Sequence, residues 1–128
     1  MTTTSKTNTT YQLHIELSTT IDIRIGQLGT FTFPEGQYVY TGSAKRNIDA
    51  RVQRHLRRDK KLHWHIDYLL NTAQANIVSV KRTALSECTA NLAVKGEIVV
   101  NRFGATDCRS GCGSHLKRTN IITATTSN

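Results

Sequence analysis

The sequence predicts an α+β sandwich, within the broad α/β class, built on a small and mainly antiparallel sheet. Several short segments alternate apolar and polar residues, which is typical of strands, and other segments repeat apolar residues at helical spacing. The two kinds of segment are mixed along a chain of 128 residues, of which 38% are hydrophobic. A chain of this length buries one hydrophobic core, so we expect a single domain.

Strand patterns dominate the first third of the chain. Residues 11–17 (YQLHIEL) and 21–25 (IDIRI) both alternate, and their closeness in sequence predicts a hairpin between them. Residues 30–33 (TFTF) form a short third strand or extend the second. After a Pro-Glu-Gly turn, residues 37–41 (QYVYT) alternate again.

Helical spacing begins after these strands. We expect one helix over about residues 47–58, a second over residues 64–70, and a third from Thr83 to Lys95. A strand at residues 76–81 separates the last two helices. The apolar positions that we assign to the interior are Ile48, Val52 and Leu56 in the first helix and Leu85, Cys88 and Leu92 in the third.

Both ends of the chain are polar and of low complexity. We expect a disordered tail over residues 1–10 and a flexible tail over residues 119–128, with the folded domain between them at residues 11–118. No apolar run reaches the length of a membrane span, and the first ten residues lack the apolar segment of a secretory signal. Three cysteines are too few for a disulfide framework, which favours a cytoplasmic protein with reduced thiols.

Basic residues are concentrated in one stretch. Residues 45–61 hold eight basic and two acidic side chains, a net charge of +6 out of +8 for the whole chain. Such a cluster attracts polyanions through counterion release, although a solvated helix face is an equally good explanation of the charge alone. The basic residues are Lys45, Arg46, Arg51, Arg54, Arg57, Arg58, Lys60 and Lys61.

Several motifs together resemble the GIY-YIG nuclease superfamily, and more closely its small stand-alone branch, DUF123. They are YVYTGSAKRNIDARVQRH at Tyr38–His55, then KKLHWHIDYLL, SEC and DCRSGCGSHL. The resemblance extends over about residues 11–116. It implies a three-stranded antiparallel sheet flanked by helices. It also implies hydrolysis of phosphodiester bonds in DNA with one divalent metal ion, Mg²⁺ or Mn²⁺, and so a role in DNA repair or processing.

The resemblance assigns catalytic residues to the strands and to the first helix. The second motif tyrosine matches Tyr40, and the first matches Tyr11, where two threonines replace the expected Gly-Ile. The helical arginine matches Arg51, with His55 one turn later, and Arg54 is an alternative only by adjacency. The other basic residues of the 45–61 stretch are expected to bind nucleic acid.

The metal-binding glutamate of the resembled family matches Glu87. Some members use an asparagine further on, for which Asn101 is the nearest candidate. A carboxylate suits Mg²⁺ or Mn²⁺, because these ions prefer oxygen ligands and complete their shell with water and substrate phosphate. Glu87 alone would equally be explained as an acidic residue in the first turn of a helix.

Phosphodiester hydrolysis requires an activated water and stabilisation of the charge on the phosphoryl oxygens. Arg51 offers a planar fork to those oxygens. We expect Tyr11 to be the base or the group that positions the water, and Tyr40 and His55 to orient water and phosphate, and the same residues also fit with these roles exchanged. Each residue alone has an ordinary structural explanation, such as a half-buried strand tyrosine, but the occurrence of all five in order favours function.

Two further clusters suggest metal binding. His63 and Asp67 have helical spacing, but we favour a structural pair of His65 and Asp67 with Trp64 and Tyr68 as packing anchors. A zinc site is a less favoured alternative to buried thiols, because the usual CxxC spacing is missing. Its ligands would be Cys88, Cys108, Cys112 and His115.

Three functions follow from these observations. The first is a metal-dependent DNA endonuclease. The second is a nucleic-acid-binding module without catalysis on the same fold, and the third is a zinc-stabilised adaptor domain. A domain of this size offers little surface for sequence-specific binding, so a branched or damaged substrate or a partner protein would supply the targeting.

Overall fold

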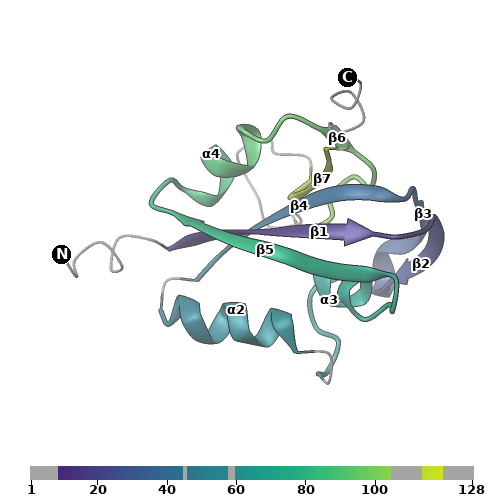
Figure 1. Ribbon diagram of the computed structural model, residues 1–128, viewed down its shortest axis with the longest axis horizontal. Coiled ribbons are helices and arrows are strands. Elements are labelled where there is room, and N and C mark those ends of the chain that lie inside the picture. Colours follow the sequence, from purple (N-terminus) through teal and green to yellow (C-terminus); the bar gives the residue numbers. More distant parts are fainter. Residues whose placement is uncertain (1–8, 45, 58–59, 105–113, 120–128) are drawn as a thin grey trace.

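The computed structural model describes residues 9–44, 46–57, 60–104 and 114–119. Strands in these residues are Thr10–Leu17 (β1), Ile21–Ile25 (β2), Gly29–Phe33 (β3), Gly36–Ser43 (β4), Ala75–Thr83 (β5), Glu97–Ile98 (β6) and Leu116–Arg118 (β7). The helices are the 3-10 turn Gly26–Leu28 (η1), Ile48–Leu56 (α2), His65–Leu70 (α3) and Glu87–Leu92 (α4). The α+β class and the mainly antiparallel sheet are confirmed (Figure 1).

The main sheet is larger than expected. In the described part of the chain it has five strands in the order β5-β1-β4-β7-β6, so the expectation of a three-stranded sheet is wrong. Every pairing in it is antiparallel. β1 lies between β4 and β5 and pairs with both over its whole length, with a register shift between His14 and Ile15. The additional strands β6 and β7 are only two and three residues long, too short to give a clear alternating pattern.

The predicted hairpin between residues 11–17 and 21–25 is also wrong. β2 pairs with β3, which is a strand of its own, and the two form a separate ribbon in which Ile21 lies opposite Phe33. The chain leaves the main sheet at Ser18, whose amide donates to the carbonyl of Gln74. Proximity in sequence was therefore outweighed by long-range pairing, which makes β1 an interior strand of the sheet between β5 and β4.

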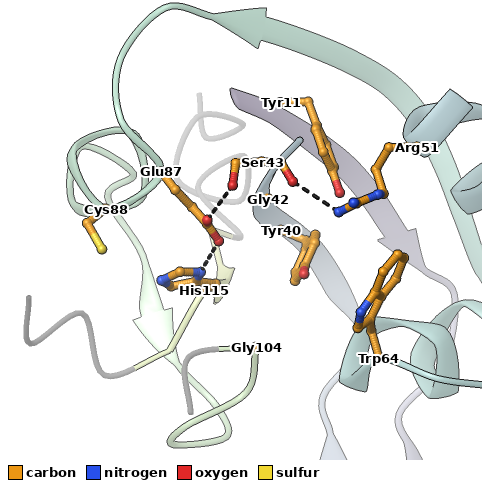
Figure 2. A pocket seen from close by; sticks show the side chains of 10 residues that line it. All are labelled: Tyr11, Tyr40, Gly42, Ser43, Arg51, Trp64, Glu87, Cys88, Gly104 and His115. Carbon is orange, nitrogen blue, oxygen red and sulfur yellow. Dashed lines mark hydrogen bonds and ion pairs between the residues drawn. The ribbon is translucent and has the colours of Figure 1, made fainter. Parts of the chain in front are cut away.

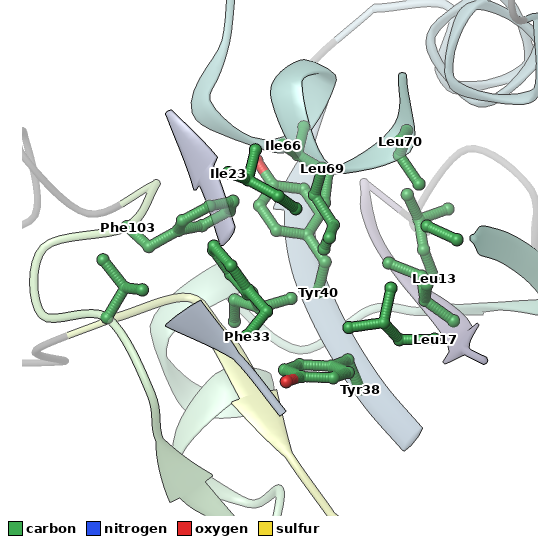
Figure 3. Packing of buried hydrophobic residues seen from close by; sticks show 14 of the residues in the cluster. Leu13, Leu17, Ile23, Phe33, Tyr38, Tyr40, Ile66, Leu69, Leu70 and Phe103 are labelled. Carbon is green, nitrogen blue, oxygen red and sulfur yellow. The ribbon is translucent and has the colours of Figure 1, made fainter. Parts of the chain in front are cut away.

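The core lies between the sheet, the β2–β3 ribbon and helix α3. Alternate residues of β1 are fully buried in it, and they meet aromatic side chains from β3 and β4 and apolar side chains from α3 (Figure 3). Phe33 and Phe103 pack edge to face with their ring centroids 6.2 Å apart. The labelled members in Figure 3 are Leu13, Leu17, Ile23, Phe33, Tyr38, Tyr40, Ile66, Leu69, Leu70 and Phe103.

The helices lie on opposite faces of the sheet. α2 and α3 lie on the side towards which Tyr11 and Tyr40 point, and α4 lies on the other side (Figure 1). α4 is bound through Gln12 of β1, whose amide donates to the carbonyl of Ala90. The buried Lys117 of β7 donates to the carbonyls of Asn91 and Val94 at the end of this helix, where a positive charge is favourable.

The third helix is shorter than predicted. It begins after Ser86, whose side chain accepts from the amide of Thr89, and ends at Leu92 rather than at Lys95. Leu85 and Leu92 are 49% and 56% exposed, so the expectation that they face the interior is wrong. Buried positions in this helix are instead Ala90 and Asn91.

The other predicted elements stand close to their expected bounds. The first helix is confirmed as α2, and Val52 in it is buried. Leu56 at its end is 46% exposed, so the assignment of Leu56 to the interior is wrong. The second is confirmed as α3, and the strand at residues 76–81 as β5. The predicted tails lie mostly outside the described residues. In the part of the chain that the structure describes, no helix is both long and apolar enough to span a membrane.

Candidate functional site

A cavity of about 540 Å³ opens beside the C-terminal end of β4. β7 pairs only with Tyr38–Tyr40, so β4 extends beyond it, and side chains from both faces of the sheet reach this place. Figure 2 shows Arg51 and Trp64 on one side of the cavity and Glu87, Cys88 and His115 on the other. The lining residues are Tyr11, Tyr40, Gly42, Ser43, Arg51, Trp64, Glu87, Cys88, Gly104 and His115.

Arg51 reaches the cavity from the middle of α2. The helix begins after Asn47, which has a left-handed backbone (φ 46°). The side-chain oxygen of Asn47 caps the helix by accepting from the amide of Ala50. Arg51 Nη1 donates to the carbonyl oxygen of Ser43 at 3.0 Å. Among the described residues no carboxylate lies within ion-pair distance of Arg51. Its guanidinium therefore retains capacity to bind an anion in the cavity.

Arg54 is one helical turn away but is differently engaged. Its two terminal nitrogens donate to both oxygens of Asp67 at 3.0 and 3.1 Å, and Nη2 also donates to the carbonyl of Lys61. This bidentate pair ties α2 to α3. The sequence left Arg54 as an alternative to Arg51, and the structure places only Arg51 at the cavity.

Glu87 enters the cavity from the first turn of α4. Its Oε1 accepts from the hydroxyl of Ser43 at 2.7 Å, and its Oε2 lies 2.7 Å from Nδ1 of His115 (Figure 2). Burial opposes ionisation of Glu87, but these contacts from His115 and Ser43 outweigh it and hold the pKa of the carboxyl below its usual value. Glu87 is therefore an ionised carboxylate at neutral pH.

Tyr11 and His55 form a buried pair beside the cavity. The Tyr11 hydroxyl lies 2.7 Å from Nε2 of His55. Burial raises the pKa of Tyr11 to about 12, although the charge and the hydrogen bond of Arg51 act against it. Burial lowers the pKa of His55 to about 4, although the charge of Asp67 acts against it. At neutral pH the phenol thus keeps its proton and the imidazole is neutral.

Tyr40 completes the set of predicted catalytic residues. Its ring packs edge to face against His55 and Phe103, and Gly104 lies against it. Burial raises the pKa of Tyr40 above its usual value, so its hydroxyl also stays protonated. Tyr11, Tyr40, Arg51 and Glu87 therefore share one cavity, whereas His55 lies behind Tyr11 and does not line it.

The predicted basic residues are distributed more widely. Arg46, Arg57 and Lys61 are exposed. Lys60 donates through its ammonium to the carbonyls of His55 and Arg57 at the end of α2. Lys45 and Arg58 lie outside the described residues.

The predicted zinc ligands are only partly described. Cys88 and His115 both line the cavity, and Cys108 and Cys112 lie outside the described residues. Within residues 9–44, 46–57, 60–104 and 114–119, no three His, Cys, Asp or Glu side chains are grouped so as to hold a metal ion.

The HWHID segment has a structural role. Asp67 Oδ2 accepts from the amides of His63 and Trp64, both at 2.8 Å, and Nδ1 of His65 accepts from the amide of Gly104. Asp67 thus has a structural role, but its hydrogen-bond partners are Arg54 and the amides of His63 and Trp64, and His65 bonds Gly104 instead of the expected Asp67.

Sequence reasoning missed two contacts of the cavity. Ser43 bridges Arg51 and Glu87, and its position directly after Tyr40-Thr41-Gly42 is the one signal for it. His115 was considered as a zinc ligand and as part of the DCRSGCGSHL motif, but no local pattern indicated that it lies against Glu87, 28 residues earlier.

Gly42 lies directly opposite Tyr11 in the sheet, and a Cβ at this position would lie 2.6 Å from the Tyr11 hydroxyl oxygen. We expect Gly42→Ala to displace the phenol and to lower the free energy of unfolding by about 1–3 kcal/mol, the cost of overpacking. Urea unfolding measures this loss. In a Tyr11→Leu background the same substitution should cost much less; an equal cost in both backgrounds would contradict the explanation.

The pH dependence of stability should report on His55. Because the pKa of His55 is about 4 when folded and near 6.5 when unfolded, the unfolded chain binds the extra proton between these values. Stability should therefore fall as the pH is lowered from 6.5 to 4, by up to about 3 kcal/mol from this residue. His14 and His65 contribute in the same direction, so urea unfolding of His55→Gln beside the unmodified protein isolates the effect. Parallel pH profiles for the two proteins would rule it out.

The fold and the cavity define an α+β protein that gathers a carboxylate, a guanidinium and two phenols from four elements of the chain. Residues 10–127 match the family described as Domain of unknown function DUF123. The match covers nearly the whole chain, and the protein belongs to this family. No curated protein and no solved structure shows significant similarity to the chain.

Proposed function

We propose that this protein is a metal-dependent endonuclease of the GIY-YIG type that hydrolyses phosphodiester bonds in DNA, in repair or processing. One observation carries the proposal. The ionised Glu87 and the Arg51 guanidinium, which has no carboxylate partner in the described part of the chain, line the same cavity as the hydroxyls of Tyr11 and Tyr40. These are the groups that phosphodiester hydrolysis requires.

Arg51 would bind the phosphoryl oxygens. Its guanidinium is planar, stays charged at all relevant pH values and donates in a fork that fits two oxygens of a phosphate. The Ser43 carbonyl occupies one donor of Nη1, which fixes the group and leaves other donors for the ligand.

Glu87 would hold the divalent ion, Mg²⁺ or Mn²⁺. The donor set fits such an ion, because the carboxylate is ionised, 30% exposed and faces a cavity whose other walls carry hydroxyl oxygens. One carboxylate suffices when water and substrate phosphate supply the remaining oxygens. When bound, the ion supplies Lewis-acid stabilisation of the charge that develops on the phosphoryl oxygens.

Tyr11 would relay the proton of the attacking water. Because its hydroxyl is protonated, it does not act as a phenolate base; it passes its own proton to Nε2 of neutral His55 while accepting one from the water. His55 is weakly basic in the free protein, and the negative charge of a bound phosphate raises its proton affinity. Tyr40 keeps its proton and donates a hydrogen bond to the water or to a phosphoryl oxygen.

A cleavage assay tests the proposal. Labelled single-stranded, duplex and branched DNA are incubated with the protein and Mg²⁺, Mn²⁺ or EDTA. We expect cleavage with either ion, none with EDTA, and a strong loss for Arg51→Met. Arg24→Met is the matched control, since Arg24 is exposed on β2 and donates to the nearby Gly26 carbonyl. Equal cleavage by Arg51→Met and the unmodified protein would refute the role of Arg51.

A nucleic-acid-binding module without catalysis is the second candidate. It is favoured by the exposed basic residues Arg46, Arg57 and Lys61 on and beside α2. This function predicts binding that weakens steeply with salt and no cleavage with either metal ion. The same assay, combined with binding measurements over a range of salt concentrations, distinguishes the two candidates.

A further inference from the structure

Two guanidinium groups lie against the ring of Trp64. The Arg51 Cζ is 4.7 Å and the Arg54 Cζ 4.3 Å from the ring centroid, both within the range of a cation–π interaction. The imidazole of His55 also packs on this ring, with centroids 5.7 Å apart. Trp64 thus contacts three side chains of α2, those of Arg51, Arg54 and His55.

The two arginines depend on Trp64 to different degrees. Arg54 is fixed by its bidentate pair with Asp67, and would stay in place without the ring. The Arg51 guanidinium is held by the Ser43 carbonyl, the hydroxyl of Tyr11 and the face of Trp64 (Figure 2). No described carboxylate holds it, so the indole contributes a large part of what orients its guanidinium.

Trp64 is itself held rigidly. Its amide donates to Asp67 Oδ2 at 2.8 Å, and the ring of His63 packs against it with centroids 5.4 Å apart. A rigid aromatic face beside a long, flexible side chain reduces the number of rotamers that the side chain samples. The guanidinium is then already oriented before an anion arrives.

We propose that Trp64 is a positioning residue that holds the Arg51 guanidinium towards the cavity and thereby sets the affinity of the site for phosphate groups. The inference rests on the proposed function, in which Arg51 binds the phosphoryl oxygens. It assigns no chemical step to Trp64 and places its effect in ligand affinity.

Binding without cleavage tests the inference. Fluorescence anisotropy of a labelled oligonucleotide is measured in EDTA for Trp64→Leu, Trp64→Phe and Arg51→Met. We expect Trp64→Leu to bind about tenfold more weakly, the effect of a partly desolvated cation–π contact, and Trp64→Phe to recover most of the affinity. Leu69→Ala is the control for stability, because Leu69 is a buried core residue of α3, the helix that begins directly after Trp64. It should lower the unfolding midpoint and leave the affinity unchanged.

The outcomes separate this inference from the proposed function. Unchanged affinity in Trp64→Leu would overturn the inference. If Leu69→Ala, against expectation, loses as much affinity as Trp64→Leu, the effect of Trp64 is one of stability and the inference is likewise overturned. If Arg51→Met also binds like the unmodified protein, the proposed function loses its phosphate ligand.

Intrinsic fluorescence gives a second measurement on the unmodified protein. Trp64 is the only tryptophan in the chain, so its emission reports directly on the ring beside Arg51. Titration with inorganic pyrophosphate should change this emission, and the change should disappear in Arg51→Met. An unchanged emission at saturating pyrophosphate would count against the proposed contact.

Discussion

Replacement of Glu87 by glutamine is expected to lower the rate of metal-dependent cleavage about a thousandfold, since it removes several kcal/mol of stabilisation from the transition state. Glutamine keeps the size of the side chain and an oxygen that can accept from Ser43. It removes the negative charge that the proposed function assigns to the cation. The variant should therefore fold normally, lose activity and bind Mn²⁺ more weakly.

Glu97→Gln is the matched control for this prediction. Glu97 is also a glutamate near an arginine, but its partner is Arg118, and it is not among the residues that line the cavity. Cleavage rates from single-turnover assays and Mn²⁺ binding by calorimetry give two separate measurements. Glu87→Gln with the rate and the Mn²⁺ affinity of Glu97→Gln would remove Glu87 from the proposed mechanism.

The largest loss of stability is expected for Asp67→Asn. Asp67 is 0% exposed and accepts from the amides of His63 and Trp64 as well as from both terminal nitrogens of Arg54. The amide group of asparagine presents hydrogens to some of these donors, and Arg54 loses its counter-charge. Removing one partner of a buried ion pair costs about 3–5 kcal/mol, which urea unfolding followed by circular dichroism would measure.

Asp49→Asn is the corresponding exposed control. Asp49 pairs with Arg82, and its side chain is 76% exposed, so we expect a loss of no more than about 1 kcal/mol.

The pH dependence of stability gives a further check on Asp67. Burial opposes ionisation of Asp67, but its hydrogen bonds from Arg54 and the two amides hold its pKa below the usual value. Its contribution is therefore present above about pH 4 and is lost as the pH falls through the lower, folded pKa. A loss of stability in Asp67→Asn no larger than that in Asp49→Asn would contradict the structural role of Asp67.

Local patterns predicted the elements of this fold better than their arrangement. The i, i+4 spacing of Ile48 and Val52 located α2, and alternation in YQLHIEL located β1, because each signal lies within one element. The partners of β1 are β4 and β5, and β5 begins 58 residues after the end of β1. Such pairings depend on which apolar faces are buried together, and a single sequence does not specify them.

In the candidate site too, several residues could be predicted from the sequence, whereas the contacts between elements could not. Tyr40, Arg51 and Glu87 were selected by a resemblance in which they occur in order, and the structure brings them to one cavity. The bridge through Ser43 and the contact of His115 with Glu87 depend on where α4 and β7 dock. Trp64 was expected to be a packing anchor; its contact with Arg51 arises only when α3 lies beside α2.

His115, directly before β7, lies at one wall of the cavity, so the site depends on one of the last segments of the chain to be synthesised. A ribosome releases Arg51 and Glu87 well before residues 114–118, so the nascent chain carries the two charged groups before their surroundings are complete. Docking of the last strand onto β4 brings the imidazole to the carboxylate. The surroundings of Glu87 are therefore complete only after residues 114–118 have been synthesised and β7 has paired with β4.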